Sequence, residues 1–408
     1  MIKVALVDLD DTLIRTNTDE FIAAYLKTWA IHASHKGWDG RTFVEASQVV
    51  LKHIFEEYDP SRTIAQRFLD GFARTVQEDI ETIEHFFHDF FETSFRDLQP
   101  RIEVLPAAQH MIRALQDQGV RIVVATNPAL PRASIIQRMA WGGWDDPQAF
   151  EQITTMETMA FAKPQPEYYA ELLIQLDVDP GQAIMIGDSW TNDIVPAAAV
   201  GIRTVWLNGD MTPQLQSTLS PAFVGSHDEF TAAIKDGWLK TCTPRQLDRT
   251  ALLARLAAYP SIVARLCADY PQAVLECIPA EGEWSVRDVI CHLVDHEREE
   301  DRAKLERVLT EDNPFLSANY DPWDQAYQFA AVPVDEAYKQ FVHYRHSTLQ
   351  WLDALPHEIW TRPARHPIFG PTSFLEMVKF ITDHDRTHLQ QMRHTVRIAD
   401  QLCELEQT

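Results

Sequence analysis

Cysteine is scarce in this chain of 408 residues and is absent from the first 241. No two cysteines form a Cys-x-x-Cys pair, and all five lie beyond residue 241: Cys242, Cys267, Cys277, Cys291 and Cys403. This pattern argues against a disulfide framework and favours reduced thiols in a cytoplasmic protein. The sequence also shows no uninterrupted apolar run of about 18 residues or more and no basic, cleavable N-terminal region. We therefore expect no membrane span and no secretion signal.

Positive charge is the second shortage. Lysine and arginine number 36 against 60 aspartate and glutamate residues, which gives a net charge of −24. Nucleic-acid binding needs clustered basic residues, so this balance argues against it, and it disfavours anionic membranes as well. Phosphorylated substrates are not excluded, because a bound Mg²⁺ inverts the local potential. The length suggests two or three domains of ordinary globular composition.

Short aliphatic runs alternate with helical stretches over the first ~240 residues. Runs of this kind are typical of strands buried on both faces of a parallel sheet. The predicted strands are Val4–Val7, Arg121–Ala125, Ala183–Ile186 and Thr204–Leu207, with helices such as Ala107–Gln118 and Glu167–Leu176 between them. The pattern predicts an α/β fold with a doubly wound parallel sheet.

A helical insertion and a later change to all-helical sequence define the predicted domains. Residues 17–98 show helical, aromatic-rich patterns without a strand, and an insert at that point would cover the carboxyl edge of the sheet, where ligands bind. We expect a core of residues 1–16 and 99–238, with 17–98 as a helical cap. A linker is predicted at 239–246. Residues 247–408 are expected to form an all-α four-helix bundle, with helices near 247–269, 285–309, 334–354 and 373–395.

The first candidate site begins at the end of the first strand. Asp8 and Asp10 alternate there, with Thr12 following, so both carboxylates project on the same side of the chain. Two carboxylates held so close are stable if a cation lies between them or one of them is protonated. Either condition suits phosphoryl transfer.

Further polar residues follow the other predicted strands. Thr126-Asn127 follows the second strand, Lys163 lies in the next loop, and Asp188 and Asp193 follow the strand Ala183–Ile186. Loops at the carboxyl ends of parallel strands converge, so we expect these residues in one site. Any one of them alone is more often a turn residue or a helix cap. The whole set in this order arises by chance much more rarely than any one of these residues alone.

The chemistry of this set suggests roles. Asp8 would attack phosphorus and form an aspartyl-phosphate, while Asp10 would protonate the leaving oxygen and later activate water. Mg²⁺ would be held by Asp8, the Asp10 backbone carbonyl and Asp188, with Asp193 in support. The phosphoryl group would be bound by Thr12, Thr126, Asn127 and Lys163, of which Thr126 and Lys163 would also assist catalysis.

These motifs resemble those of the haloacid dehalogenase-like hydrolases. Asp8-Leu9-Asp10-Asp11-Thr12-Leu13 is similar to the first motif, Thr126 to the second, Lys163 to the third, and Gly187-Asp188 through Asp193 to the fourth. The resemblance covers residues ~1–238 and implies a Mg²⁺-dependent phosphohydrolase with a mobile C1-type cap. It also implies a phosphatase in preference to a dehalogenase, because dehalogenases of the family lack the second aspartate. The substrate is not readable from the cap, where pairs such as His32 and His35 indicate a helix face more often than a ligand site.

A second candidate site lies in the C-terminal half. His384 and His388 are four residues apart on a predicted helix and so share a face, and His292 on another helix could complete a three-histidine site. Neutral imidazoles suit Zn²⁺, Ni²⁺ or Fe²⁺. His296 is an alternative ligand. A solvated helix face is the ordinary alternative, and a protease-like His-Glu-x-x-His motif is disfavoured because Asp385 stands in place of the glutamate.

Residues ~247–395 resemble the DinB-like family of damage-inducible four-helix bundles. The resemblance rests on the segment from Trp284 to Leu293 and on the later predicted helix that contains His384 and His388. It implies a divalent metal on His292, His384 and His388, and for some relatives thiol-dependent transfer. A homodimer is implied by the resemblance only.

Two functions follow as expectations. The first is a cytoplasmic Mg²⁺-dependent phosphohydrolase for a small phosphorylated metabolite, fused to a metal-binding bundle. The alternative makes the bundle the working part, as a metal-dependent thiol transferase or small-molecule binding module. A purely structural role is disfavoured, since it would leave Asp8, Asp10, Asp188 and Asp193 near one another without a compensating cation.

Overall fold

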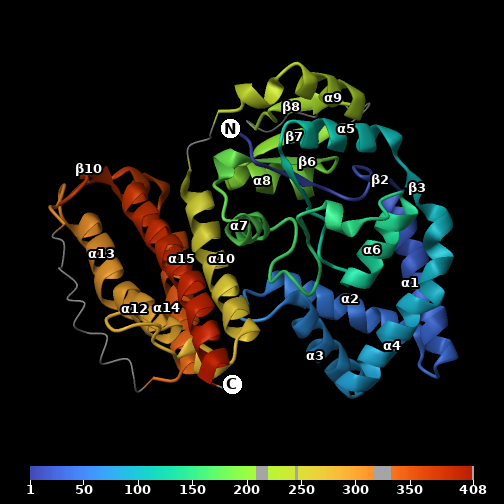
Figure 1. Cartoon of the computed structure of the whole chain (residues 1–408), viewed down its shortest axis with the longest axis horizontal. Helices are drawn as coiled ribbons and strands as arrows, with labels where there is room; N and C mark the ends of the chain where they lie inside the picture. The colour runs from blue at the N-terminus through green and yellow to red at the C-terminus, as the bar shows by residue number, and fades with distance from the viewer. Residues whose placement is uncertain (208–218, 244–246, 317–331, 407–408) are drawn as a thin grey trace. The chain divides into compact units, whose positions relative to one another are not determined.

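The chain divides into two compact units, Met1–Gln246 and Leu247–Thr408, in a computed structural model that describes residues 1–207, 219–243, 247–316 and 332–406 (Figure 1). The predicted linker, 239–246, spans this division. A short 3₁₀ helix, η5 (Trp238–Thr241), occupies its first part, and residues 244–246 lie outside the described residues.

The N-terminal unit is built on a six-stranded parallel sheet in the order β5-β4-β1-β6-β7-β8. The strands are β1 (Val4–Val7), β4 (Arg121–Val124), β5 (Gln152–Ile153), β6 (Ala183–Gly187), β7 (Arg203–Leu207) and β8 (Phe223–Gly225). The central strand β1 is buried along its whole length, as its continuous aliphatic sequence predicts. The predicted doubly wound sheet is confirmed, and β5 and β8 extend it at its two edges.

Helices cover both faces of this sheet. Figure 1 shows α5 (Pro106–Asp117) and α9 (His227–Lys235) together on one side, with α7 (Pro166–Gln175) and α8 (Val195–Ala199) on the other. Both α5 and α7 begin with proline, which tolerates the first helical turn because the N–H it lacks would have no intrahelical partner there. Helix α6 (Arg132–Trp141) follows β4, and short 3₁₀ turns lie at η2 (Pro147–Ala149) and η3 (Pro180–Gln182).

Between β1 and β4 the chain leaves the sheet and forms a helical insertion. It consists of α1 (Thr18–His35), α2 (Gly40–Glu56), α3 (Ile64–Val76), α4 (Ile80–Glu92) and the 3₁₀ helix η1 (Ser94–Arg101). Each α-helix begins after a side chain that accepts a hydrogen bond from the first turn: Asn17, Asp39, Thr63 and Asp79. Trp29 packs against Phe43, Phe72 and Phe86, so the aromatic residues form the interior of this insertion.

The insertion is joined to the core through a two-stranded antiparallel sheet. Strand β2 (Ile14–Arg15) enters the insertion and β3 (Glu103–Val104) leaves it, with Ile14 paired to Val104. The chain therefore enters and leaves the insertion through adjacent strands.

The C-terminal unit is mainly helical, as predicted. Its long helices are α10 (Arg249–Asp269), α12 (Val286–Asp295), α14 (Val334–Ala354) and α15 (Phe374–Glu406), with the shorter α11 (Gln272–Leu275), α13 (Arg302–Thr310) and η8 (His357–Thr361). Two details differ from the prediction. The helix expected at 285–309 is interrupted by a π-helical segment, η6 (His296–Asp301), and an antiparallel hairpin of β9 (Pro363–His366) and β10 (Gly370–Ser373) precedes α15. Turn residues at 367–369 separate two strands too short to stand out as an alternating pattern.

Helix α10 is long and apolar enough to cross a membrane by length and composition alone, but 72% of its apolar window is buried inside the protein. Its Leu252 and Leu256 join a core cluster with Leu352 of α14 and Phe374 of α15. The burial identifies α10 as a core helix of the bundle.

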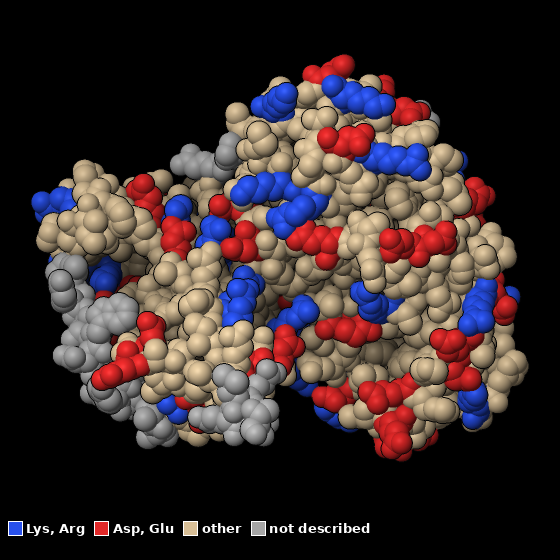
Figure 2. Space-filling model, in the orientation of Figure 1, with Lys and Arg blue, Asp and Glu red and all other residues tan. Residues whose placement is uncertain are grey.

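Charge is mixed on the protein surface. On the face of the N-terminal unit that Figure 2 shows, lysine and arginine side chains are interspersed with acidic ones. The excess acidic residues of the sequence thus do not form one continuous acidic patch on this face.

Candidate functional sites

The first site is centred on the side chain of Asp8, directly after β1. Its backbone N–H donates to the carbonyl of Ile186 in β6 (2.9 Å), which fixes the residue at the carboxyl edge of the sheet. Single carboxylate oxygens of Asp8, Asp188 and Asp193 lie within 4.8 Å of one another. Three of the predicted carboxylates are thus brought together from the end of β1 (Asp8), the turn after β6 (Asp188) and the π-helical segment η4 (Trp190–Ile194), which contains Asp193.

Lys163 supplies the positive charge of this group. Its Nζ donates to Oδ1 of Asp8 (2.7 Å) and to Oδ1 of Asp193 (2.6 Å). The lysine is buried, with 4% of its surface exposed. Burial alone would lower the pKa of this ammonium group, but Asp193 and Asp8 outweigh it and raise the pKa well above its usual value. Lys163 is therefore charged at any ordinary pH.

One lysine does not neutralise three carboxylates. Burial, together with the neighbouring Asp8 and Asp193, raises the pKa of Asp188 to about 8. Burial and Asp8 likewise raise the pKa of Asp193 to about 7, although Lys163 opposes the shift. Carboxylate oxygens converging with excess negative charge are the donor set that Mg²⁺ prefers. The residues present therefore fit a divalent cation.

The predicted phosphate-binding residues lie at the same sheet edge. Pairing of Val7 with Val124 places Thr126 near Asp8, and the Thr126 carbonyl accepts hydrogen bonds from Thr154 Oγ1 (2.7 Å) and Tyr168 (3.0 Å). Within the described residues, two buried oxygens here have no hydrogen-bond partner: Oγ1 of Thr12 and Oδ1 of Asn127. Unpaired buried polar atoms are costly, so they are consistent with a ligand that would pair with them.

Asp10 lies apart from the three-carboxylate group, and its side chain pairs with Arg138 of α6. Burial raises the pKa of Asp10, Arg138 opposes that shift, and Asp8 adds to it. The next residue, Asp11, has a left-handed backbone (φ 52°), an uncommon conformation that turns the chain sharply away from β1. Sequence reasoning missed Arg138, because a lone arginine on a helix beyond the second motif carries no signal of its own.

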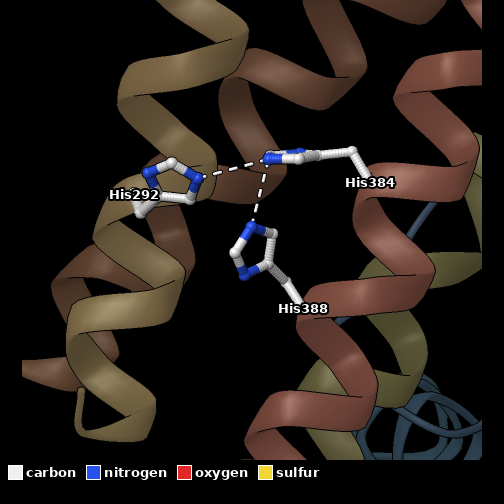
Figure 3. A group of neighbouring side chains, drawn as sticks. All are labelled: His292, His384 and His388. Atoms are coloured by element: carbon white, nitrogen blue, oxygen red, sulfur yellow. Dashed lines mark hydrogen bonds between the residues drawn. The ribbon is translucent and has the colours of Figure 1, made fainter. Parts of the chain in front are cut away.

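The second site lies between α12 and α15 (Figure 3). Nε2 of His384 is 3.2 Å from Nε2 of His292 and 3.0 Å from Nε2 of His388. A ring nitrogen offers either one proton or one lone pair, in a single in-plane direction, so His384 cannot satisfy both neighbours by hydrogen bonding. Three converging imidazole nitrogens fit a bound transition metal instead.

Protonation of this cluster is disfavoured. Burial and the neighbouring histidines lower the pKa of His292 to about 3 and that of His384 to about 2. Nδ1 of His388 lies 2.8 Å from Oε1 of Gln391, which can only accept there. That contact places the His388 proton on Nδ1 and leaves Nε2 with its lone pair toward the cluster.

The alternative ligand His296 lies outside the three-histidine group. Its ring stacks on His384 at 4.3 Å, but its Nδ1 lies 3.0 Å from Oδ2 of Asp301. Asp385 is equally unsuited to the role of a protease glutamate. It is 2% exposed and accepts two hydrogen bonds from Arg345 (2.7 and 3.1 Å), so it faces the interior of the bundle.

Comparison with known proteins matches each unit to a family. The family of haloacid dehalogenase-like hydrolases matches residues 5–207. The DinB superfamily matches residues 238–392. Both resemblances predicted from the sequence are confirmed.

Several named relatives match about half of this chain. A bifunctional riboflavin kinase/FMN phosphatase of Arabidopsis thaliana is 28% identical over 204 residues, which is 49% of this chain and 47% of the plant protein. The pyrophosphatase PpaX of Bacillus pumilus is 27% identical over 203 residues, covering 50% of this chain and 82% of PpaX. The chain thus spans about half the length of the plant relative.

Two solved structures are similar to parts of the chain. A phosphatase of the hydrolase family from Thermococcus onnurineus covers 58% of this chain and 98% of its own, with 18% identity and a TM-score of 0.37. YfiT from Bacillus subtilis, described as a probable metal-dependent hydrolase with an unusual four-helix bundle topology, covers 38% of this chain and 91% of its own, with 17% identity and a TM-score of 0.33.

Proposed function

We propose that the N-terminal unit is a Mg²⁺-dependent phosphohydrolase that acts on a small phosphorylated metabolite through an aspartyl-phosphate. The observation that carries the proposal is the convergence of Asp8, Asp188 and Asp193 around Lys163 at the carboxyl edge of the sheet. The phosphatases among the named relatives support the same reaction class.

Each residue has a chemical role in this proposal. Asp8, held at the strand end, attacks phosphorus, and the P–O bond to the leaving group breaks as Asp10 protonates the leaving oxygen. Asp10 then takes a proton from the water that hydrolyses the aspartyl-phosphate. Lys163 and the Thr126 hydroxyl bind the phosphoryl oxygens. Mg²⁺, held by Asp8, Asp188 and Asp193, would neutralise negative charge at the phosphoryl group.

The test is phosphate release from a panel of phosphorylated metabolites, with and without Mg²⁺. We expect turnover by the wild type with Mg²⁺ only, and its loss in Asp8→Asn. Asp11→Asn is the matched control, since it makes the same chemical change three residues along and asparagine tolerates the left-handed backbone at that position. Full activity of Asp8→Asn would remove the proposal.

We further propose that the C-terminal unit binds a divalent transition metal through His292, His384 and His388. Nε2 of His384 lies 3.2 Å from His292 Nε2 and 3.0 Å from His388 Nε2 and cannot hydrogen-bond to both, which favours this proposal over a set of satisfied core histidines. Three protein ligands leave open positions for a small molecule, and thiol-dependent transfer is the alternative use of such a site.

Metal content and calorimetric titration with Zn²⁺, Ni²⁺ and Fe²⁺ test this second proposal. We expect one metal per chain, lost in His384→Ala. His394→Ala is the matched control, because His394 is exposed on the same helix. Equal metal binding by wild type and His384→Ala would contradict the proposal.

A further inference from the structure

Arg138 is a buried cation that the roles given above leave unexplained. It lies on α6, the helix after the Thr126 loop, and only 4% of it is exposed. Arg132, on the same helix, is exposed. Charged side chains are rarely buried without paired charges, so the placement of Arg138 calls for partners.

The protein supplies Arg138 with fewer partners than it can use. A guanidinium group offers five N–H donors. Within the described residues, its hydrogen bonds run from Nη2 to Asp10 only, and Nε is buried without a partner. One flat face of the guanidinium is covered by the Phe21 ring of the insertion, 4.5 Å from the Arg138 Cζ atom. The remaining capacity of the group lies at its edge, in the plane where it binds anions.

The position of Arg138 relative to the reaction follows from its contact with Asp10. In the proposed reaction Asp10 donates its proton to the leaving oxygen, so the leaving group lies within hydrogen-bond reach of Asp10. Arg138 touches Asp10 directly and therefore borders the leaving group. Lys163 contacts Asp8 and Asp193 instead, on the side of the phosphoryl group. The site thus has one cation for each end of a substrate.

We propose that Arg138 binds an anionic substituent of the leaving group, so that the preferred substrates are small phosphoryl compounds that carry a second negative charge close to the scissile bond. This inference rests on the proposed phosphohydrolase function and names its substrate class. Either a carboxylate or a second phosphate has the planar or tetrahedral oxygens that a guanidinium edge binds through two hydrogen bonds. An uncharged leaving group of equal size would leave Arg138 with Asp10 alone.

The experiment compares kcat/KM for three substrates of similar size. Pyrophosphate has a phosphate leaving group, 2-phosphoglycolate a carboxylate-bearing one, and ethyl phosphate an uncharged one. With the wild type we expect at least one anionic substrate to exceed ethyl phosphate by about 10- to 100-fold, the range of a charge-assisted hydrogen bond. The anionic substrate whose advantage over ethyl phosphate depends on Arg138 identifies the substituent.

Variants of Arg138 give the second readout. In Arg138→Met the ratio of anionic to uncharged kcat/KM should fall by about 10- to 100-fold, mainly through KM, whereas Arg132→Met should keep the wild-type ratio. The ratio is used because loss of the Asp10 contact lowers turnover of all three substrates alike. Should Arg138→Met fail to fold, Arg138→Lys keeps the charge without the planar edge, and a reduced ratio is expected there too.

Two outcomes would overturn the inference while leaving the phosphohydrolase proposal intact. One is a wild type with no preference for either anionic substrate. The other is an Arg138→Met or Arg138→Lys variant that keeps the wild-type ratio, which would make Arg138 a positioning residue for Asp10 only. Absence of Mg²⁺-dependent turnover on every substrate, or full activity of Asp8→Asn, would remove both proposals.

Discussion

Gly187 leaves the space in which the carboxylate of Asp193 lies. A methyl group on the Cα of Gly187 would come 2.2 Å from Oδ2 of Asp193, well inside contact distance. Two hydrogen bonds hold that carboxylate in place, because Oδ2 accepts from the Ser189 N–H (3.0 Å) and Oδ1 accepts from Lys163 (2.6 Å). Gly187→Ala should therefore displace Asp193 and lower phosphatase turnover by roughly 100-fold, the effect of a misplacement of about 1 Å.

The measurement is steady-state phosphate release by full-length protein. Gly71→Ala is the control, since it adds the same methyl group in helix α3, where the nearest atom is Val50 Cγ1 at 3.0 Å. Wild-type turnover in Gly187→Ala would show that Asp193 is not needed in its observed position.

His32 makes the stability of the N-terminal unit depend on pH. Its side chain is buried in the insertion between Ser94 (2.8 Å from Nδ1) and Asp89 (3.1 Å from Nε2), and burial lowers its pKa even though Asp89 opposes the shift. In the unfolded chain the histidine binds a proton below pH ~6.5, whereas the folded protein resists doing so. Stability from this residue is therefore present above pH ~6.5 and is lost as the pH falls below it.

Urea unfolding at pH 7.5 and 5.5 measures this dependence. His32→Asn should be less stable than wild type at pH 7.5 and should lose less stability between the two pH values, by up to about 1 kcal/mol. His35→Asn, an exposed position on the same helix, should keep the wild-type dependence. An unchanged pH dependence in His32→Asn would argue that other groups dominate.

Gln391 orients one ligand of the proposed metal site. Because its Oε1 fixes the proton of His388 on Nδ1, Gln391→Leu should weaken transition-metal binding by about 10- to 100-fold without unfolding the bundle. Calorimetric titration with Zn²⁺ gives the affinity, and circular dichroism monitors the helices. Gln390→Leu, at the exposed neighbouring position, is the control. Equal affinities in the two variants would mean that the His388 tautomer is set elsewhere.

Arg345 balances two buried acids in the bundle. It donates through Nε to Glu297 (3.0 Å) and through Nη1 and Nη2 to Asp385, and all three side chains are at most 3% exposed. Arg345→Met would leave two carboxylates without their cation, so we expect a loss of about 3–5 kcal/mol. Hydrogen exchange of α12, α14 and α15 in the full chain reports this loss. The triple variant Arg345→Met, Glu297→Leu, Asp385→Leu should recover most of it, and a triple variant as unstable as the single one would contradict the argument.

The fold was predictable where local sequence decides it. The strand Val4–Val7 was predicted to the residue, because a continuous aliphatic run is what a strand buried on both faces requires. Strands β5 and β8 were missed because each has only two or three residues and lies at the sheet edge. The π-helical segment at His296–Asp301 was equally invisible, since one extra residue per turn leaves little trace in a helical pattern.

The candidate sites divide in the same way. Asp8 and Asp188 were predictable because parallel strands must bring their carboxyl ends to one edge, and His384 and His388 because helical spacing puts them on one face. Arg138, Gln391 and Arg345 were not. Their importance depends on where long side chains reach after the helices pack, and no spacing in the sequence encodes that.

The antiparallel pairing of β2 with β3 has a consequence for how the N-terminal unit is assembled. Since Ile14 lies opposite Val104, the insertion leaves and rejoins the core at neighbouring points, as an inserted domain does. A core nucleus can close over such an insertion at a modest entropic cost, because that cost grows only slowly with the length of the loop. We therefore expect that the insertion can be exchanged for another helical domain without displacing the residues at the carboxyl edge of the sheet.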